Sequence, residues 1–224
     1  MNNNIINVAI DGPAGAGKST VARGAAKQLG YIYVDTGALY RAIGVNALRN
    51  GVDTKDKAAV AASLDGVKVN LVFENGEQKV MLNGEDVSVE IRTPEASMAA
   101  SDVSAVPEVR AFLFNLQRDI AKRNNCIMDG RDIGTVVLPQ AQVKIFLTAS
   151  PEIRAERRYK ELIEKGSEVD YQSVLDDIVK RDYNDSHREI APLKPAEDSV
   201  LFDTTGLALD ESVAAITKII KEKI

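Results

Sequence analysis

The sequence predicts an α/β fold built on a five-stranded parallel β-sheet, and three observations carry this prediction. Short apolar runs, such as residues 5–11 and 143–149, have the length and composition of buried strands. Helical patterns follow these runs closely. The strand–helix–strand succession over residues 5–34 is so tight that it requires a parallel sheet with right-handed crossovers. Alternating, turn-rich segments interrupt the series between residues 64 and 92, which indicates a small antiparallel β insertion.

The first strand leads into a glycine-rich loop and a helix over residues 19–29, which Gly30 ends in a capping position. The loop has the spacing G-x-x-x-x-G-K-[ST] in a strand–loop–helix context, which disfavours a glycine-rich turn without a ligand. Glycines let backbone N–H groups converge on a phosphate, and the helix start adds its positive dipole end. Lys18 is expected to reach the β- and γ-phosphates of a nucleotide, and the Ser19 hydroxyl to hold Mg²⁺. The residues expected to form this phosphate-binding site are Gly12, Pro13, Ala14, Gly15, Ala16, Gly17, Lys18, Ser19 and Thr20.

A second strand over residues 31–34 is followed by a helix over residues 38–49. In parallel sheets, ligands gather at the carboxyl ends of the strands. Polar side chains stand at these ends or one turn into the next helix, and they are Asp11, Asp35, Thr36 and Arg41.

The rest of the chain divides by the same patterns. In the insertion we expect strands over 67–73, 78–82 and 85–89, turns at 74–77 and 83–84, helical segments after 95 and a helix over 107–122. Further core strands are expected over 126–129, 143–149 and 200–204, and helices from 151 to about 165, over 171–190 and over 209–222. We therefore predict one domain over 1–224, with a core at about 1–62, 123–150 and 190–224, an insertion at about 63–122 and a lid at about 151–170.

Composition excludes several classes of protein. A net charge of −5 without a dominant basic run argues against general nucleic-acid binding. Cys126 lies in an apolar run and is expected in the core. His187 is the single histidine of the sequence, which rules out histidine-rich metal sites, and it is expected on an exposed helix face. Neither a leader pattern nor an apolar run of membrane-spanning length is present, so we expect a cytoplasmic location without membrane association.

Arginine placement is the second functional signal. Several arginines follow strand ends or lie on helices that leave them, and their planar fork binds phosphate oxygens bidentately. For any single one, a surface ion pair with Glu or Asp is the alternative. These arginines are Arg41, Arg131, Arg154, Arg157, Arg158, Arg181 and Arg188.

Asp129 follows a strand and precedes a glycine, a position that holds Mg²⁺ in phosphate-loop enzymes; a turn cap is the alternative. The chain offers no histidine–acid pair and no His-Arg-Asp loop as a general base. A phosphate monoester acceptor needs none, because its second pKa is about 6 and its oxygen is mostly ionised at pH 7. The missing base therefore favours a phosphate acceptor over an alcohol.

Five motifs together resemble the bacterial cytidylate kinases over essentially the whole chain. They are residues 10–20, 35–41 (Asp-Thr-Gly-Ala-Leu-Tyr-Arg), 84–92, 129–135 (Asp-Gly-Arg-Asp-Ile-Gly-Thr) and 181–188. The second and fourth are far more specific than the phosphate loop. At Ser19 many relatives have Gly, but Ser is the norm in phosphate loops.

This resemblance implies a nucleoside monophosphate kinase of pyrimidine metabolism that transfers the γ-phosphoryl group of ATP to CMP or dCMP with Mg²⁺. We expect it to act as a monomer. By position, Thr36, Arg41 and Arg131 would hold the acceptor phosphate, and Asp35 would also bind the substrate. Ser101, Arg110 and Asp132 would read the base, and Arg181, Asp185 and Arg188 would meet the ribose and the phosphates. Arg154, Arg157 and Arg158 would sit on the lid, the first two binding ATP. The catalytic residues would be Lys18, Arg131, Arg158 and Arg188.

The assignment to the base agrees with the chemistry of cytosine. Asp132 can accept from the N4 amino group, while Arg110 and Ser101 can donate to N3 and O2; uracil would turn an acceptor oxygen toward Asp132. A solvated helix arginine and a helix cap are the alternatives for Arg110 and Ser101.

Three rival functions are disfavoured. An adenylate-kinase-like enzyme shows a Gly-Phe-Pro-Arg type of sequence where this chain has Gly130-Arg131-Asp132. A GTPase switch requires an Asn-Lys-x-Asp signature after a strand, and neither the fourth nor the fifth predicted strand leads to one. A nucleic-acid-binding ATPase is disfavoured by charge.

Overall fold

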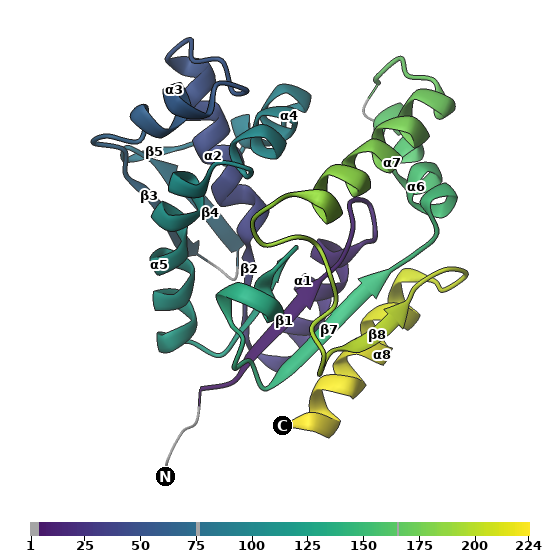
Figure 1. Cartoon of the computed structure of the whole chain (residues 1–224). Coiled ribbons are helices and arrows are strands. Elements are labelled where there is room, and N and C mark those ends of the chain that lie inside the picture. Colours follow the sequence, from purple (N-terminus) through teal and green to yellow (C-terminus); the bar gives the residue numbers. More distant parts are fainter. Residues whose placement is uncertain (1–4, 75–76, 165) are drawn as a thin grey trace. The chain divides into compact units, whose positions relative to one another are not determined.

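A computed structural model describes residues 5–74, 77–164 and 166–224. It confirms the α/β fold, with a five-stranded parallel sheet in the order β2-β6-β1-β7-β8 and a separate antiparallel sheet in the order β3-β4-β5 (Figure 1). The chain divides into two compact units, one consisting mainly of Tyr31–Cys126 and the other of Ile6–Gly30 and Ile127–Ile224. No helix within the described ranges is long and apolar enough to cross a membrane.

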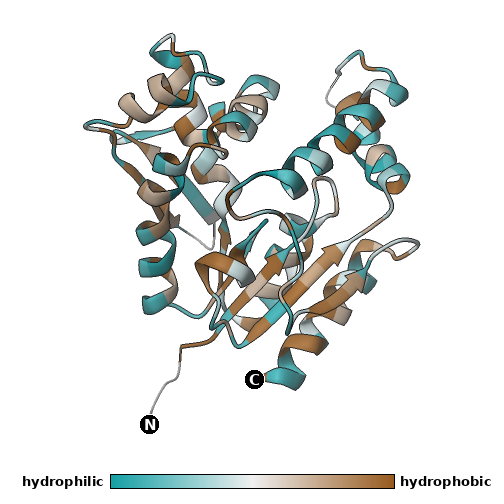
Figure 2. Cartoon of the chain, in the orientation of Figure 1, coloured by the Kyte–Doolittle hydropathy of each residue, from teal (hydrophilic) through white to brown (hydrophobic). Residues whose placement is uncertain are grey.

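The second unit is organised around three parallel strands, β1 (Asn7–Asp11), β7 (Val143–Thr148) and β8 (Val200–Asp203). Val8 of β1 is opposite Val143 of β7, and Ile145 of β7 is opposite Val200 of β8. β1 and β7 are near-continuous apolar runs because helices cover such strands on both faces, and both are largely brown in Figure 2. β6 (Cys126–Gly130) is also apolar until Asp129.

Two helix pairs complete this unit. α1 (Lys18–Leu29) packs against α8 (Leu209–Lys223), and α6 (Pro151–Glu164) packs against α7 (Tyr171–His187). The α6–α7 pair is held by a small apolar cluster of Ala155, Val174 and Ile178. A single π-helical turn, η2 (Ile133–Val137), follows β6 and is absent from the sequence prediction.

The first unit combines β2 (Ile32–Asp35) and a mainly helical segment with the antiparallel sheet. Its further elements are α2 (Thr36–Arg49), α3 (Lys57–Ala62), β3 (Val69–Glu74), β4 (Glu77–Leu82), β5 (Glu85–Asp86), η1 (Glu90–Arg92), α4 (Pro94–Val103) and α5 (Pro107–Arg123). The core comes from α2, β4, α4 and α5, with Leu39, Ile43, Val80, Leu82 and Leu113 deeply buried.

Most expected elements are confirmed, and some differ in their bounds. The Asn83-Gly84 turn forms with both residues at positive φ, 52° and 89°, as a tight hairpin turn requires. The strand after it is shorter than predicted and comprises Glu85–Asp86, because the side-chain hydroxyl of Ser88, not a backbone oxygen, accepts the N–H of Val80 on β4. α7 ends at His187 rather than near residue 190, since Arg188 adopts an extended conformation. α3 was not predicted. Residues 75–76 of the predicted 74–77 turn, and residue 165 at the predicted helix end, lie outside the described residues.

Candidate functional site

The phosphate loop connects the end of β1 to the start of α1. Gly12 has φ 153°, and a Cβ placed there would lie 1.9 Å from the backbone oxygen of Leu147 on β7. Only glycine fits so close to a neighbouring strand. Gly17 precedes α1 in a left-handed conformation and supplies no side-chain cap. The first turn of α1 therefore presents backbone N–H groups suited to an anion.

Lys18 is buried beside this loop, and its Nζ donates to the carbonyl of Pro13 at 2.7 Å. Burial, and next the positive charge of Arg131, hold the pKa of the Lys18 ammonium well below its usual value. The site therefore brings positive charge together at an energetic cost. An arriving phosphate would offset this cost by favouring the charged ammonium.

Ser19, in the first turn of α1, contacts Asp129 near the carboxyl end of β6. The Ser19 hydroxyl donates to Asp129 Oδ2 at 2.9 Å, and Asp129 is buried. A hydroxyl and a carboxylate are hard oxygen donors of the kind that Mg²⁺ takes when it is bound by few protein groups and by substrate phosphates. The two residues fit the predicted metal position on the chemistry of their donor atoms.

Two arginine–carboxylate pairs stand near this point. Arg131 Nε donates to Asp185 Oδ2 on α7 at 2.8 Å, and Arg188 lies 3.4 Å from Asp132 Oδ1. Burial opposes ionisation of Asp185, but the charges of Arg131, Arg181 and Arg188 outweigh it and hold its pKa below the usual value. The structure thus brings together the predicted residues of the 129–132 loop and those of α7.

The three arginines of α6 have different surroundings. Arg154 is buried and contacts protein oxygens through all three guanidinium nitrogens, at Ala149, Ala14 and Asp182. Arg157 donates to the carbonyl and hydroxyl oxygens of Thr204 after β8. Arg158 pairs with Glu161 one turn along its own helix, which is the surface ion pair considered as the alternative.

In the first unit, Asp35 organises the start of α2. Its Oδ1 accepts from the Ala38 N–H at 3.0 Å as a helix cap, and its Oδ2 accepts from Arg41 at 2.7 Å. The Asp35 backbone N–H donates to Gln78 Oε1 of β4 at 2.9 Å. Thr36, the first residue of α2, is buried. Asp35 therefore both caps α2 and orients the side chain of Arg41.

Ser101 and Arg110 lie on α4 and α5 of the same unit. Arg110 is 9% exposed, 5.7 Å from the Tyr40 ring centre and 3.4 Å from the Ser104 carbonyl, so it is not a solvated surface arginine. Ser101 lies within α4 and caps neither α4 nor α5.

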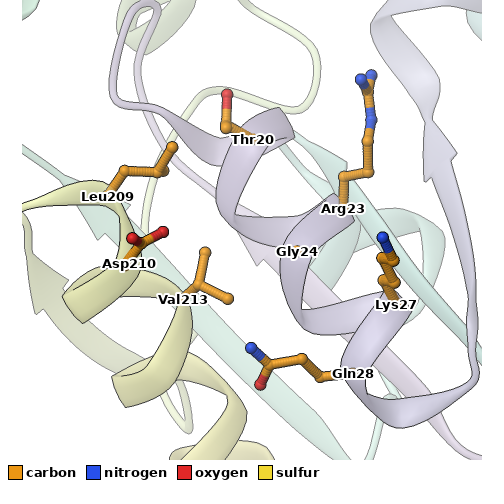
Figure 3. A pocket seen from close by; sticks show the side chains of 8 residues that line it. All are labelled: Thr20, Arg23, Gly24, Lys27, Gln28, Leu209, Asp210 and Val213. Atoms are coloured by element: carbon orange, nitrogen blue, oxygen red, sulfur yellow. The ribbon is translucent and has the colours of Figure 1, made fainter.

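A shallow groove of about 670 Å³ runs between α1 and α8 (Figure 3). Of the predicted site residues it contains Thr20 alone. Its other lining residues are Arg23, Gly24, Lys27, Gln28, Leu209, Asp210 and Val213.

Three residues order the site in ways that the sequence did not predict. Asp11 accepts from the backbone N–H groups of Ile133 and Gly134, at 2.8 and 2.7 Å. Gln78 holds the end of β2, and Asp182 holds Arg154. The strand-end position of Asp11 was a signal for this role. No local pattern indicates the roles of Gln78 and Asp182, because their partners, Asp35 and Arg154, lie far from them along the chain.

The interpretations of Cys126 and His187 are confirmed. Cys126 is fully buried, and burial raises the pKa of its thiol to about 12. His187 is exposed at the end of α7, where its ring stacks on Tyr183 with centres 4.0 Å apart.

An α/β fold with a phosphate loop after its first strand, an adjacent Ser–Asp oxygen pair and clustered arginines defines the class of phosphate-loop kinases. Within that class, the family model for cytidylate kinase matches residues 8–222. The chain belongs to the cytidylate kinase family.

Relatives extend over nearly the whole chain. Cytidylate kinase of Caldicellulosiruptor bescii is 50% identical, covering 98% of this chain and 99% of the relative. Cytidylate kinase of Lactobacillus johnsonii is 53% identical, covering 99% and 96%. Among solved structures, an uncharacterised protein from Eubacterium ventriosum has a TM-score of 0.53 at 13% identity, covering 96% of this chain and 98% of that one. At this identity the likeness concerns the fold alone.

Proposed function

We propose that the protein transfers the γ-phosphoryl group of ATP to CMP, and to dCMP, forming CDP and dCDP with Mg²⁺. The observation that carries the proposal is the 129–132 loop beside the phosphate loop. Asp129 accepts from Ser19, and Arg131 and Asp132 pair with charged groups on α7 or directly after it. One loop thus joins the phosphate-binding chemistry to groups that can recognise a second nucleotide.

On the donor side, the residues 12–20 would hold the ATP phosphates, and Lys18 would neutralise charge on the transferred group. Ser19 and Asp129 would hold Mg²⁺, which when bound screens phosphate charge and orients the phosphate oxygens. Arg131, Arg158 and Arg188 would stabilise the charge that develops during transfer. No general base is required, because the acceptor oxygen is already ionised.

On the acceptor side, Thr36, Arg41 and Arg131 would hold the phosphate of the monophosphate substrate. Asp35 would belong to the same substrate site, where it accepts from Arg41. Ser101, Arg110 and Asp132 would recognise cytosine, and Arg181, Asp185 and Arg188 the ribose and phosphates. The burial of Arg110 and Asp132 supports these roles, since a desolvated polar group discriminates strongly between matched and mismatched partners.

The proposal includes the finer organisation inferred from the sequence. Residues of about 151–170 would form a lid carrying Arg157 and Arg158, and about 63–122 the monophosphate-binding insertion within a single kinase domain. We further propose that the protein is a monomer in the cytoplasm that binds neither nucleic acid nor membranes.

The test is a coupled assay with ATP against CMP, dCMP, UMP, AMP and GMP. We expect CMP and dCMP to be phosphorylated far faster than the others, with activity lost when EDTA removes divalent cations. Lys18→Met is the inactive reference, because Met keeps the apolar stem without the charge. Equal rates with AMP or GMP would overturn the assignment of the acceptor.

A further inference from the structure

Arg154, in the first turn of α6, connects three separate parts of the second unit. Its Nε donates to the carbonyl of Ala149 at the end of β7, at 2.8 Å. One terminal nitrogen donates to the carbonyl of Ala14 in the phosphate loop at 2.9 Å. The other contacts Asp182 Oδ2 on α7 at 2.6 Å. Each nitrogen of the guanidinium fork is therefore directed at a different segment.

The phosphate loop rests directly on this residue. Arg154 is 3% exposed, and a Cβ added to Gly15 would lie 3.2 Å from Arg154 Cβ and 3.6 Å from Ile178 Cδ1. Residues 14–15 therefore pack directly against the α6–α7 pair.

α7 carries functional groups close to the contact with Asp182. Arg181 is the neighbouring residue, and Asp185 lies three residues on, about one helical turn. The charges of Arg181 and Asp185 both act on the pKa of Lys18, so α7 and the phosphate loop share one electrostatic environment.

We propose that Arg154 is a positioning residue that fixes the phosphate loop relative to α7, and that Asp182 holds Arg154 in place. The guanidinium nitrogens of Arg154 are engaged with Ala149, Ala14 and Asp182. Arg154 therefore orders the loop that binds the donor phosphates instead of binding ATP itself. This role rests on the proposed function and deepens it: the ATP-binding loop and the helix bearing Arg181 and Asp185 are set by a single side chain.

The geometry explains why arginine stands here. A buried guanidinium is stable only when its donors are satisfied, and its rigid fork reaches three acceptors in fixed directions. Lysine keeps the charge but is a single point with a flexible stem, so it cannot span all three oxygens. Asp182→Asn keeps the shape and one acceptor oxygen but removes the charge that pairs with Arg154.

The experiment compares Arg154→Lys, Asp182→Asn and the double variant with wild type. The control is Lys160→Met, which removes an exposed ion pair with Glu156 on the same helix. Two quantities are measured: KM for ATP and for CMP together with kcat, and hydrogen exchange of peptides covering residues 12–20 in the nucleotide-free protein.

We expect both single variants to raise KM for ATP on the order of tenfold and to speed exchange in residues 12–20, with KM for CMP within about twofold. The double variant should be no worse than Arg154→Lys, because Asp182 acts through its contact with Arg154. Lys160→Met should match wild type.

Two outcomes would overturn the proposal. If Arg154 binds ATP directly, Arg154→Lys raises KM for ATP while Asp182→Asn does not, and exchange in residues 12–20 is unchanged. If the exchange rates of residues 12–20 stay at the wild-type value in every variant, Arg154 does not position the phosphate loop. The exchange measurement needs no substrate, so it distinguishes failure of this inference from failure of the assigned reaction.

Discussion

Asp11, the last residue of β1, joins two loops that carry different chemistry. It directly precedes Gly12 of the phosphate loop, and its two carboxylate oxygens accept the N–H groups of Ile133 and Gly134 in η2. Burial raises the pKa of Asp11 to about 6, although these two hydrogen bonds lower it. The carboxylate thus fixes the turn that follows Asp132 at a cost in desolvation.

This cost gives a testable pH dependence. The Asp11 pKa is higher in the folded protein than its ordinary 3.8, so its contribution to stability is full below about pH 4 and is lost as the pH rises through about 6. Against Asp11→Asn, which does not titrate, the stability of wild type should fall by up to about 3 kcal/mol from pH 4 to pH 7. Urea unfolding at several pH values measures this difference.

Asp203→Asn is the matched control, because Asp203 also ends a strand. Hydrogen bonds from Thr205 lower the pKa of the exposed Asp203, so its contribution is lost as the pH falls, the opposite direction. Parallel stability curves for wild type and Asp11→Asn would contradict the buried, titrating carboxylate.

A substitution of the single residue Asp132 tests the proposed recognition of the base. With Asp132→Ala we expect kcat/KM for CMP to fall about a hundredfold or more, because the N4 amino group loses its acceptor. KM for ATP should stay within about threefold. Asp119→Ala, which removes an exposed partner of Lys122, should leave both unchanged. Unchanged CMP kinetics in Asp132→Ala would exclude the role in base recognition.

At the scale of elements, the start of α2 combines a helix cap with a functional side chain. Asp35→Ala should lower the free energy of unfolding by about 1 kcal/mol, the usual value of a cap. It should also raise KM for CMP, because Arg41 loses the carboxylate that orients it. Chemical unfolding and steady-state kinetics measure the two effects.

Asp56→Ala is the control, because Asp56 caps α3 through Ala58 and Ala59 without contacting a proposed site residue. It should lower stability by a similar amount and leave KM for CMP unchanged. If both variants affect CMP binding equally, the orientation of Arg41 by Asp35 is not the cause.

The close packing of α1 against α8 depends on a glycine, Gly24, which has no side chain. A Cβ at Gly24 would lie 2.8 Å from Val213 Cγ2, closer than real contacts allow. Glycine to alanine in a helix usually stabilises by about 1 kcal/mol, but here overpacking should destabilise by about 1–2 kcal/mol net. Thermal unfolding should show recovery in the Gly24→Ala/Val213→Ala double variant. A stabilised Gly24→Ala would show that α8 can move aside.

Elements set by local sequence were predictable, and those set by distant partners were not. The phosphate loop, the left-handed Gly30 cap and the Asn83-Gly84 turn follow from the residues that form them. η2 depends on Asp11, more than a hundred residues earlier. Arg154 could be recognised as an arginine near a strand end, but its carbonyl partners at Ala14 and Ala149 exist only in the folded chain.

At the scale of the whole molecule, the proposed donor residues belong to the second unit, and Thr36, Arg41, Ser101 and Arg110 to the first. If both substrates are needed to complete the catalytic arrangement, water should be a poor acceptor. ATP hydrolysis without CMP should be slower than about one hundredth of the rate of CMP phosphorylation. Phosphate release against CDP formation measures this ratio, and a CMP-independent ATPase of comparable rate would contradict it.

Because Cys126 is buried, chemical labelling of its thiol reports local unfolding at the start of β6 without any engineered probe. Thiol reagents attack the thiolate, and this thiol, the single one in the sequence, is fully buried with its pKa raised to about 12. Labelling must therefore wait until the start of β6 is exposed. Its rate is followed by intact mass as one added group. When reclosing is faster than labelling, the ratio of this rate to that of the unfolded chain gives the free energy of the opening. Bound nucleotide should slow it by the factor that mass action dictates.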